Sequence, residues 1–305
     1  FTETANRSGF LLSRFRTGKP TYTFPENAPG GDMPAILRFA PSPNGHLHLG
    51  HAFSALYTDH WARRLGGQFL LRLEDTDISR CKPEFAEAIY DDLHWLGLSW
   101  PTPVLVQSER FPIYAAAAQR LRDLGLIYDC DCTRQEIADR STGTDPDGAP
   151  LYDGKCRVHG PAGGRPMQGR LDLARATSLT GPLTFTLAQP TPLDRPQIRY
   201  ARPELWGDVV LQRKDTPTSY HLSVVVDDAA QEITHVTRGR DMEPSTDIHV
   251  LLQMLLGLPQ PLYNFHRLIT GDDGRKLSKC KGSPGLRDLR ASGETPRSIR
   301  ARLGF

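Results

Sequence analysis

The chain has 305 residues, 38% of them hydrophobic and 24% charged, with a formal net charge of +2, which allows one large core or two moderate ones. The longest apolar runs fall far short of the roughly 20 residues that span a bilayer, and no export signal is recognisable. We therefore expect a cytoplasmic protein, whose five scattered cysteines do not form a disulfide framework.

Residues 1–34 precede the first regular pattern. They show neither helical nor strand periodicity for long, and they end in a cluster of proline and glycine. We expect an N-terminal extension there and assign no function to it.

From residue 35, short apolar runs alternate with helical patterns. Residues 35–40 predict a strand, residues 49–67 a helix and residues 68–75 a second strand. This order and spacing are typical of a right-handed βαβ unit with parallel strands. Further helices are expected at 84–98, 111–125 and 245–258, and further strands at 207–214, 220–230 and 233–239. The pattern indicates an α/β fold of the doubly wound kind, in which ligands bind at the carboxyl ends of the strands.

The turn between the first strand and the first helix, RFAPSPNGHLHLGHA at 38–52, contains two prolines, two glycines and three histidines. Small residues before a helix N-terminus leave backbone N–H groups free, and the helix dipole favours an anion there. His48 and His51 are three residues apart, so both rings can face one phosphate. The commonest phosphate loops, G-x-x-x-x-G-K-[ST] and G-x-G-x-x-G, are absent at this turn.

Three cysteines form a second candidate site: Cys130, Cys132 and Cys156. Neighbouring thiols in a cytosolic chain suggest tetrahedral zinc, which requires a fourth ligand. Spacing alone favours His159, because imidazole is a common zinc ligand and a phenol is rare. Unrelated buried cysteines are the alternative. A closed site would be structural and would fix residues 141–166, which are too poor in apolar side chains to fold by burial.

Positive charge is dense after Arg267 although the net charge of the chain is small. The basic residues there are Arg275, Lys276, Lys279, Lys281, Arg287, Arg290, Arg297, Arg300 and Arg302. Such a stretch could bind phosphates, and a solvated basic face is the alternative.

Two short motifs resemble a known family. HLGH at His48–His51 resembles the HIGH signature of class I aminoacyl-tRNA synthetases, and KLSKC at Lys276–Cys280 resembles their KMSKS signature. Flanked by RFAPSPNG, RLEDTD, SYHLSVVVDD and ITHVTRGRD, they resemble the glutamyl/glutaminyl branch, from Ala35 to near the end of the chain. Two residues depart from the pattern: His51 is often small in the glutamate branch, and Cys280 replaces a serine.

The resemblance implies a Rossmann-like parallel sheet in two halves, residues 35–127 and 201–281. It also implies a zinc-bearing insertion at 128–200 and a short, basic, helical C-terminal part at 282–305. A full glutamyl-tRNA synthetase continues into a large anticodon-binding domain, and residues 282–305 are too few for one. The resemblance is therefore to truncated members that attach glutamate to queuosine in tRNA(Asp).

The activity implied is ATP-dependent formation of glutamyl-adenylate, with Mg²⁺ accompanying ATP, and transfer of glutamate to the wobble queuosine of tRNA(Asp). The core of an ordinary glutamyl-tRNA synthetase and a non-catalytic tRNA-binding paralogue are the alternatives. The resemblance implies catalytic roles for His48, His51, Lys276 and Lys279. It implies ATP binding by His48, Gly50, His51 and Lys279.

The resemblance also implies a glutamate pocket and a ligand set for zinc. The pocket residues are Arg38, Phe39, Ala40, Pro41, Ser42, Glu74, Tyr220 and Arg238, and we expect Arg38, Glu74, Tyr220 and Arg238 at strand ends. An arginine fork matches a carboxylate, and Glu74 would face the ammonium group. The family pattern C-x-C followed by Y-x-x-x-C replaces His159 with Tyr152, which implies the ligands Cys130, Cys132, Tyr152 and Cys156.

Overall fold

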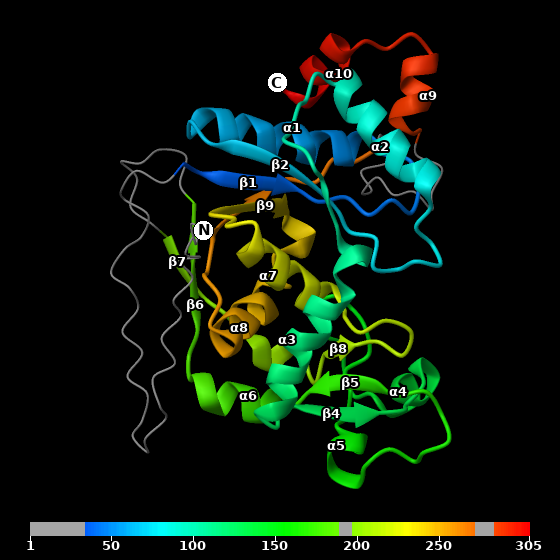
Figure 1. Cartoon of the computed structure of the whole chain (residues 1–305), viewed down its shortest axis with the longest axis vertical. Helices are drawn as coiled ribbons and strands as arrows, with labels where there is room; N and C mark the ends of the chain where they lie inside the picture. Colours follow the sequence, from blue (N-terminus) through cyan, green and yellow to red (C-terminus); the bar gives the residue numbers. More distant parts are fainter. Residues whose placement is uncertain (1–33, 189–196, 272–283) are drawn as a thin grey trace, which may run out of the picture. The chain divides into compact units, whose positions relative to one another are not determined.

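A seven-stranded sheet organises the part of the chain that the computed structural model describes, residues 34–188, 197–271 and 284–305. Its strands, in spatial order, are β3 (Leu105–Val106), β2 (Gln68–Leu73), β1 (Ile36–Phe39), β9 (His235–Gly239), β10 (Leu262–His266), β6 (Thr184–Leu187) and β7 (Gln197–Tyr200). Neighbouring strands from β3 to β6 are parallel, and β7 runs antiparallel to β6. This arrangement confirms the expected parallel α/β sheet (Figure 1).

The expected βαβ unit is confirmed. Helix α1 (Leu49–Arg64) connects β1 to β2, and the two strands pair in register with Leu37 opposite Phe69. Three more expected helices form, α2 (Pro83–Trp95), α3 (Phe111–Asp123) and α8 (Thr246–Leu256). The described part also contains the short 3₁₀ helices η1 (Gln107–Arg110), η2 (Pro203–Leu205) and η3 (Arg240–Met242).

The expected strand at 220–230 is wrong, because these residues form helix α7 (Tyr220–Ala230). A run of β-branched valines favours a strand locally. In the structure the segment is buried on nearly every side, between the sheet and the helices α3 and α8. Its apolar residues therefore lack the one-sided helical spacing by which an amphipathic helix is recognised.

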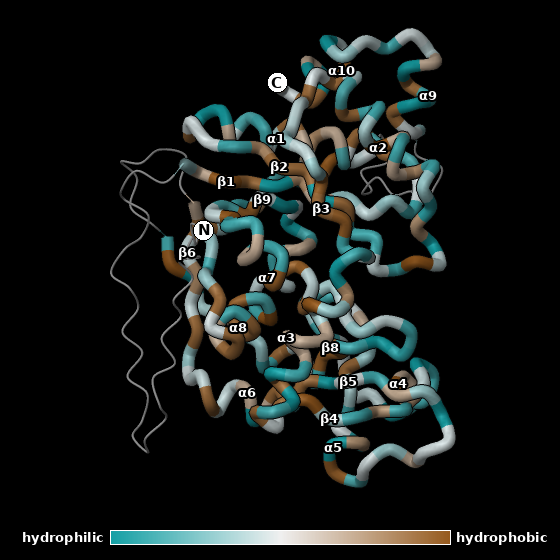
Figure 2. Tube along the Cα trace, in the orientation of Figure 1, coloured by the Kyte–Doolittle hydropathy of each residue, from teal (hydrophilic) through white to brown (hydrophobic). Residues whose placement is uncertain are grey.

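Two hydrophobic cores cover the two faces of the sheet. On one face, Leu37 and Leu56 pack with Ile89 of α2 and Ile299 of α10 (Pro296–Leu303). On the other face, α3, α7 and α8 pack against the sheet and fully bury residues such as Leu251. Figure 2 shows brown, hydrophobic stretches along β1 and β2 between these helical layers. The sheet is thus enclosed, as parallel sheets usually are.

A smaller antiparallel sheet has the order β4 (Ile127–Cys130), β5 (Gln168–Leu171) and β8 (Val210–Gln212). The strand expected at 207–214 is therefore present as β8, but it pairs with β5 and lies outside the large sheet. Nearby helices are α4 (Arg134–Arg140), α5 (Lys155–His159) and α6 (Leu173–Thr180), and α9 (Leu286–Ala291) lies near the C-terminus. Within the described ranges, every helix is too short or too polar to cross a bilayer.

Candidate active site and candidate metal centre

The strand-to-helix turn holds its two histidines by reciprocal backbone contacts. His48 is the N-cap of α1, and its Nδ1 accepts a hydrogen bond from Gly50 N at 3.0 Å. The Nδ1 of His51 accepts from His48 N at 3.1 Å, and the two ring centroids lie 3.8 Å apart. A neutral imidazole that accepts at Nδ1 carries its proton on Nε2. The turn therefore provides two Nε2–H donors at a helix N-terminus, which suits a phosphate group.

Gly50 is required by this geometry. A Cβ atom at this position would lie 2.9 Å from His48 Cε1 and 3.0 Å from His48 Nδ1. Any larger residue would therefore push the first imidazole out of its cap.

The C-terminal part of the chain begins beside the same turn. Leu286 N donates to Leu47 O at 2.7 Å, and His48 forms an isolated β-bridge with Gly285. Lys276 and Lys279 lie outside the described residues, so their catalytic roles stay predictions.

Three residues expected in the glutamate pocket belong to neighbouring strands. Arg38 lies in β1, Arg238 in the adjacent β9, and Glu74 directly follows β2. Glu74 N donates to Pro41 O at 3.0 Å, which joins Glu74 to the turn at 38–42. In this turn Phe39 and Pro41 are buried, and Ala40 and Ser42 are partly buried. Ser42 Oγ lies 3.5 Å from Cys81 Sγ.

Tyr220, the fourth, opens helix α7 and does not end a strand as we expected. Burial raises the pKa of its hydroxyl, Arg238 and Arg38 oppose that rise, and Glu74 adds to it. The Tyr220 hydroxyl thus lies within electrostatic range of Arg238, Arg38 and Glu74. The four side chains lie near one another, with Tyr220 supplied by a helix, and their role in binding glutamate stays a prediction.

Two buried residues of this cluster were missed by the sequence analysis, Arg72 of β2 and Asp228 of α7. Asp228 Oδ1 accepts from Arg38 Nε and from Arg72 Nη1, each at 2.8 Å. Arg72 is fully buried and also contacts Glu74 Oε1 at 3.1 Å. Burial raises the pKa of the Asp228 carboxyl, but the two arginines outweigh it and the pKa is lowered. The only sequence signal was a charge inside the apolar runs FLLRL and SVVVDD.

Glu74 shares these arginines. Burial raises the pKa of its carboxyl, and Arg72 and Arg38 offset only part of the rise. Two guanidinium groups and two carboxyl groups therefore meet at this edge of the sheet. Such a set offers partners for both charges of a zwitterionic ligand.

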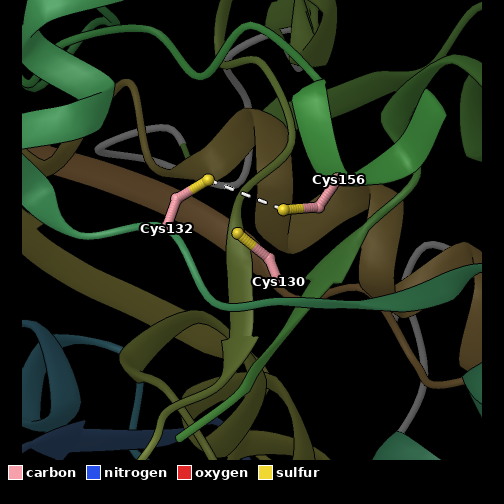
Figure 3. Close-up of side chains that lie close together, drawn as sticks. All are labelled: Cys130, Cys132 and Cys156. Atoms are coloured by element: carbon pink, nitrogen blue, oxygen red, sulfur yellow. Dashed lines mark hydrogen bonds between the residues drawn. The ribbon is translucent and has the colours of Figure 1, made fainter. Parts of the chain in front are cut away.

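Three cysteine sulfurs form the candidate metal centre. The Sγ atoms of Cys130, Cys132 and Cys156 are buried and lie within 4.8 Å of one another (Figure 3). Cys132 Sγ and Cys156 Sγ are 3.5 Å apart. Sulfurs that surround a tetrahedral ion at about 2.3 Å are about 3.8 Å apart, so the cluster has the size that zinc requires.

Tyr152 and His159 were the two candidates for the fourth ligand. The Tyr152 hydroxyl lies 3.4 Å from Cys130 Sγ and 3.8 Å from Cys132 Sγ. His159 is exposed at the end of α5, and it is not part of the group of metal-capable side chains found in the described ranges. The geometry favours Tyr152.

Cationic side chains surround these sulfurs. Arg170 Nε donates to Cys130 Sγ at 3.3 Å, and its guanidinium lies 4.0 Å from the centre of the Tyr152 ring. Arg140 Nη2 donates to Cys132 Sγ at 3.5 Å. Burial raises the pKa of the Cys130 thiol, but bonds from Tyr152 and Arg170 outweigh burial and lower it to about 7. Thiolate, the form that binds a metal, is thereby favoured at Cys130, whereas burial raises the pKa of the Cys156 thiol.

The sequence is similar to proteins of known type over most of its length. Residues 35–303 match the family model described as tRNA synthetases class I (E and Q), catalytic domain. A glutamyl-Q tRNA(Asp) synthetase of Rhodobacter capsulatus is 46% identical over 280 residues, which are 88% of this chain and 100% of that protein.

Longer proteins match in part. A glutamate–tRNA ligase of Oleidesulfovibrio alaskensis is 40% identical over 87% of this chain, which spans only 55% of the ligase. The crystal structure of a glutamate–tRNA synthetase from Elizabethkingia anophelis superposes with a TM-score of 0.62 at 26% identity, covering 86% of this chain and 54% of that one.

Proposed function

The chain belongs to the class I tRNA synthetases of the glutamate and glutamine type, and we propose that it activates L-glutamate with ATP and transfers it to queuosine in tRNA(Asp). One observation carries the choice of acceptor. The glutamyl-Q tRNA(Asp) synthetase of R. capsulatus is 46% identical to this chain over 100% of its own residues, whereas the glutamate–tRNA ligase of O. alaskensis is 40% identical.

The first step forms glutamyl-adenylate. The α-carboxylate of glutamate attacks the α-phosphorus of ATP, and the bond between the α-phosphorus and the α,β-bridging oxygen breaks, so that pyrophosphate leaves. Such a transfer needs positioning and stabilisation of the charge on the phosphate oxygens rather than a protein nucleophile. The Nε2–H groups of His48 and His51 donate to these oxygens at the helix N-terminus, with Gly50 allowing the close approach. Lys276 and Lys279 supply positive charge from the other side, and Mg²⁺ accompanies ATP.

The buried charge cluster binds glutamate. Arg38 makes a two-point contact with Asp228 and, with Ser42 and the turn residues Phe39, Ala40 and Pro41, holds carboxylate oxygens of the substrate through its remaining N–H donors. Glu74 faces the ammonium group. Tyr220 and Arg238 complete the pocket, which the electrostatic influence of Arg238, Glu74 and Arg38 on the Tyr220 hydroxyl supports.

The second step moves the glutamyl group to the tRNA. A hydroxyl of the cyclopentene diol of queuosine attacks the carbonyl carbon of the adenylate, the bond to the phosphate oxygen breaks, and AMP leaves. This hydroxyl is chemically equivalent to a ribose hydroxyl. One active site can therefore serve either acceptor, and the choice depends on how the tRNA is held.

We assign zinc to Cys130, Cys132, Tyr152 and Cys156, one ion per chain, in a structural role. The spacing of the three sulfurs, the neighbouring phenol and the lowered pKa of Cys130 fit this ion. When bound, zinc crosslinks the end of β4 to helix α5.

Exchange of pyrophosphate into ATP tests the first step. Glutamate should support the exchange without tRNA, because the carboxylate, ammonium and phosphate contacts all belong to this chain. Exchange that appears only after tRNA is added would favour an ordinary glutamyl-tRNA synthetase core, and no exchange in either condition would favour a non-catalytic tRNA-binding protein.

Radiolabelled glutamate tests the acceptor. We expect transfer to tRNA(Asp) that contains queuosine and none to the same tRNA without the modification. Nuclease mapping should place the label in the anticodon loop. Label on the terminal adenosine, or equal charging of an unmodified transcript, would contradict the proposal.

A further inference from the structure

Arg238 contacts one imidazole, which in turn contacts a second imidazole. Its Nη1 lies 3.1 Å from His249 Nδ1, and its Nη2 donates to Thr246 Oγ1. His249 Nε2 lies 3.3 Å from Nδ1 of His221, which follows Tyr220 in α7. Arg238 and His249 are 7% and 2% exposed, so the contacts between them are shielded from water. The three side chains come from β9, α8 and α7.

The chemistry of arginine determines where the protons of this chain lie. A guanidinium only donates hydrogen bonds, so the Nδ1 of His249 must accept. The proton of the neutral His249 ring is then on Nε2, which donates to His221 Nδ1. His221 must in turn carry its proton on Nε2. One tautomer of each ring completes the series of contacts, and an added proton on His249 Nδ1 would face the Arg238 cation.

The surroundings favour neutral rings. Burial lowers the pKa of His249 well below its ordinary value, and the charges of Arg238, His221, Arg38 and Arg72 lower it further. Burial and Arg238 together lower the pKa of His221 to about 4.

Aromatic rings pack against the same imidazoles. The Tyr220 ring is 5.4 Å from His249, and Trp206 meets His221 edge to face at 5.4 Å. These contacts limit rotation of both imidazoles.

We propose that His249 and His221 are positioning residues that orient the guanidinium of Arg238 toward the amino-acid substrate, acting through Arg238 and not on the reacting atoms. This inference rests on the proposed glutamate site. Within the described residues, Arg238 Nε is buried without a hydrogen-bond partner. An arginine has five N–H donors, and two of them are directed to His249 and Thr246. The Arg238 guanidinium therefore has further N–H donors with which it can bind a substrate carboxylate.

Two substitutions of His249 test its contact with Arg238, measured by pyrophosphate exchange with the full chain. His249→Leu removes the acceptor, and we expect the KM for glutamate to rise about 10- to 100-fold, the loss usual for a hydrogen bond to a charged group, while the KM for ATP is unchanged. His249→Asn keeps an acceptor near the Nδ1 position and should restore the glutamate KM to within about threefold. His221→Leu should have an intermediate effect.

Leu251→Ala is the matched control, because Leu251 is fully buried in the same helix α8. It should lower the melting temperature and leave both KM values unchanged. The positioning role would be overturned if His249→Leu raised the KM for ATP and the KM for glutamate equally. It would also be overturned if the glutamate KM of His249→Asn were no lower than that of His249→Leu.

Arg238→Lys separates this inference from the proposed site. If it leaves the glutamate KM unchanged, the site assignment fails. If it raises that KM and His249→Leu does not, only the positioning role fails. Long-range ¹H–¹⁵N spectra, assigned with His249→Asn and His221→Asn, should show both rings neutral and protonated at Nε2 at pH 7. An imidazolium or an Nδ1–H tautomer would overturn the proposal.

Discussion

His48 and His51 show how a backbone contact can determine the chemistry of a side chain. Their positions three residues apart predict that both rings face one ligand, but spacing does not identify the donating nitrogen. The backbone N–H groups of His48 and Gly50 occupy both Nδ1 atoms. Each ring is therefore a donor through Nε2 without being charged.

Gly50→Ala tests the role of this cap. The new methyl group would displace the His48 ring and break its bond from Gly50 N, so we expect kcat for pyrophosphate exchange to fall about 10- to 100-fold, with a nearly unchanged KM for glutamate. Gly143→Ala is the control, because a Cβ there meets only Leu151 Cδ1 at 3.4 Å. An unchanged kcat in Gly50→Ala would contradict the assigned role of His48.

The charged pocket was predictable from sequence only in part. Arg38, Glu74 and Arg238 could be predicted because each matches a family motif at or beside a strand. Arg72 and Asp228 were not, because their contact joins residues 156 positions apart. Local sequence indicates that a charge interrupts an apolar run, but it does not identify the partner that makes its burial tolerable.

Helix α7 shows the same limit at the scale of an element. Its valines predicted a strand, yet Asp227 and Asp228 are buried and each carboxylate has its partners on a different neighbouring element. Asp227 accepts from Arg110 Nε at 2.8 Å and from the Tyr114 hydroxyl, Oη, at 2.7 Å. Asp228 meets the arginines of the sheet. Tertiary contacts of this kind override the local strand preference of valine, whereas α1 and α3 were predictable from their helical spacing and nearby glycines.

Asp92 of α2 gives a prediction on stability. It is 5% exposed, and its Oδ2 is buried without a hydrogen-bond partner within the described residues. Burial raises the pKa of its carboxyl to about 6 although Arg290 opposes the rise. Because this pKa lies above the unfolded value, the ionised group destabilises the fold at pH 8, and the cost declines as the pH falls from 6 to 4.

Asp92→Asn removes that charge. We expect it to raise the free energy of unfolding by about 1–3 kcal/mol at pH 8 and by less than about 1 kcal/mol at pH 4. Urea denaturation at both pH values measures the difference. The exposed neighbour Asp91 provides the control, since Asp91→Asn should change little at either pH. A gain that is independent of pH would show that the charge is not its cause.

The candidate zinc site should stabilise only the segment that contains it. Elemental analysis of the unchanged protein should find about one zinc per chain. Cys132→Ser should release this metal and should speed amide hydrogen exchange in residues 131–167. Strand β4 should stay protected, because Ile127 belongs to a larger core. Cys81→Ser should retain the metal. A metal-free but fully folded protein would contradict the assignment, and zinc lost in His159→Ala but kept in Tyr152→Phe would identify His159 as the fourth ligand.

At the scale of the whole molecule, the C-terminal helices have two roles that charge density alone could not separate. Leu286, Ile299 and Leu303 are buried in the core with α1 and α2. Arg300 donates to Leu96 O at 3.1 and 2.8 Å and so closes the end of α2. Within residues 284–305, the basic face predicted from sequence therefore consists of the arginines that remain exposed, among them Arg287, Arg297 and Arg302.

These exposed arginines give the last prediction, which concerns tRNA. If they hold phosphates of the tRNA, the triple substitution Arg287→Ala, Arg297→Ala and Arg302→Ala should weaken binding and reduce the slope of log affinity against log salt by about 0.9 for each lost contact. Glutamate-dependent pyrophosphate exchange should be unchanged, because contacts to the tRNA phosphates position the tRNA and do not act on the amino acid. Arg64→Ala, at the exposed end of α1, should leave the slope unaltered. An unaltered slope in the triple variant would place the tRNA on another face.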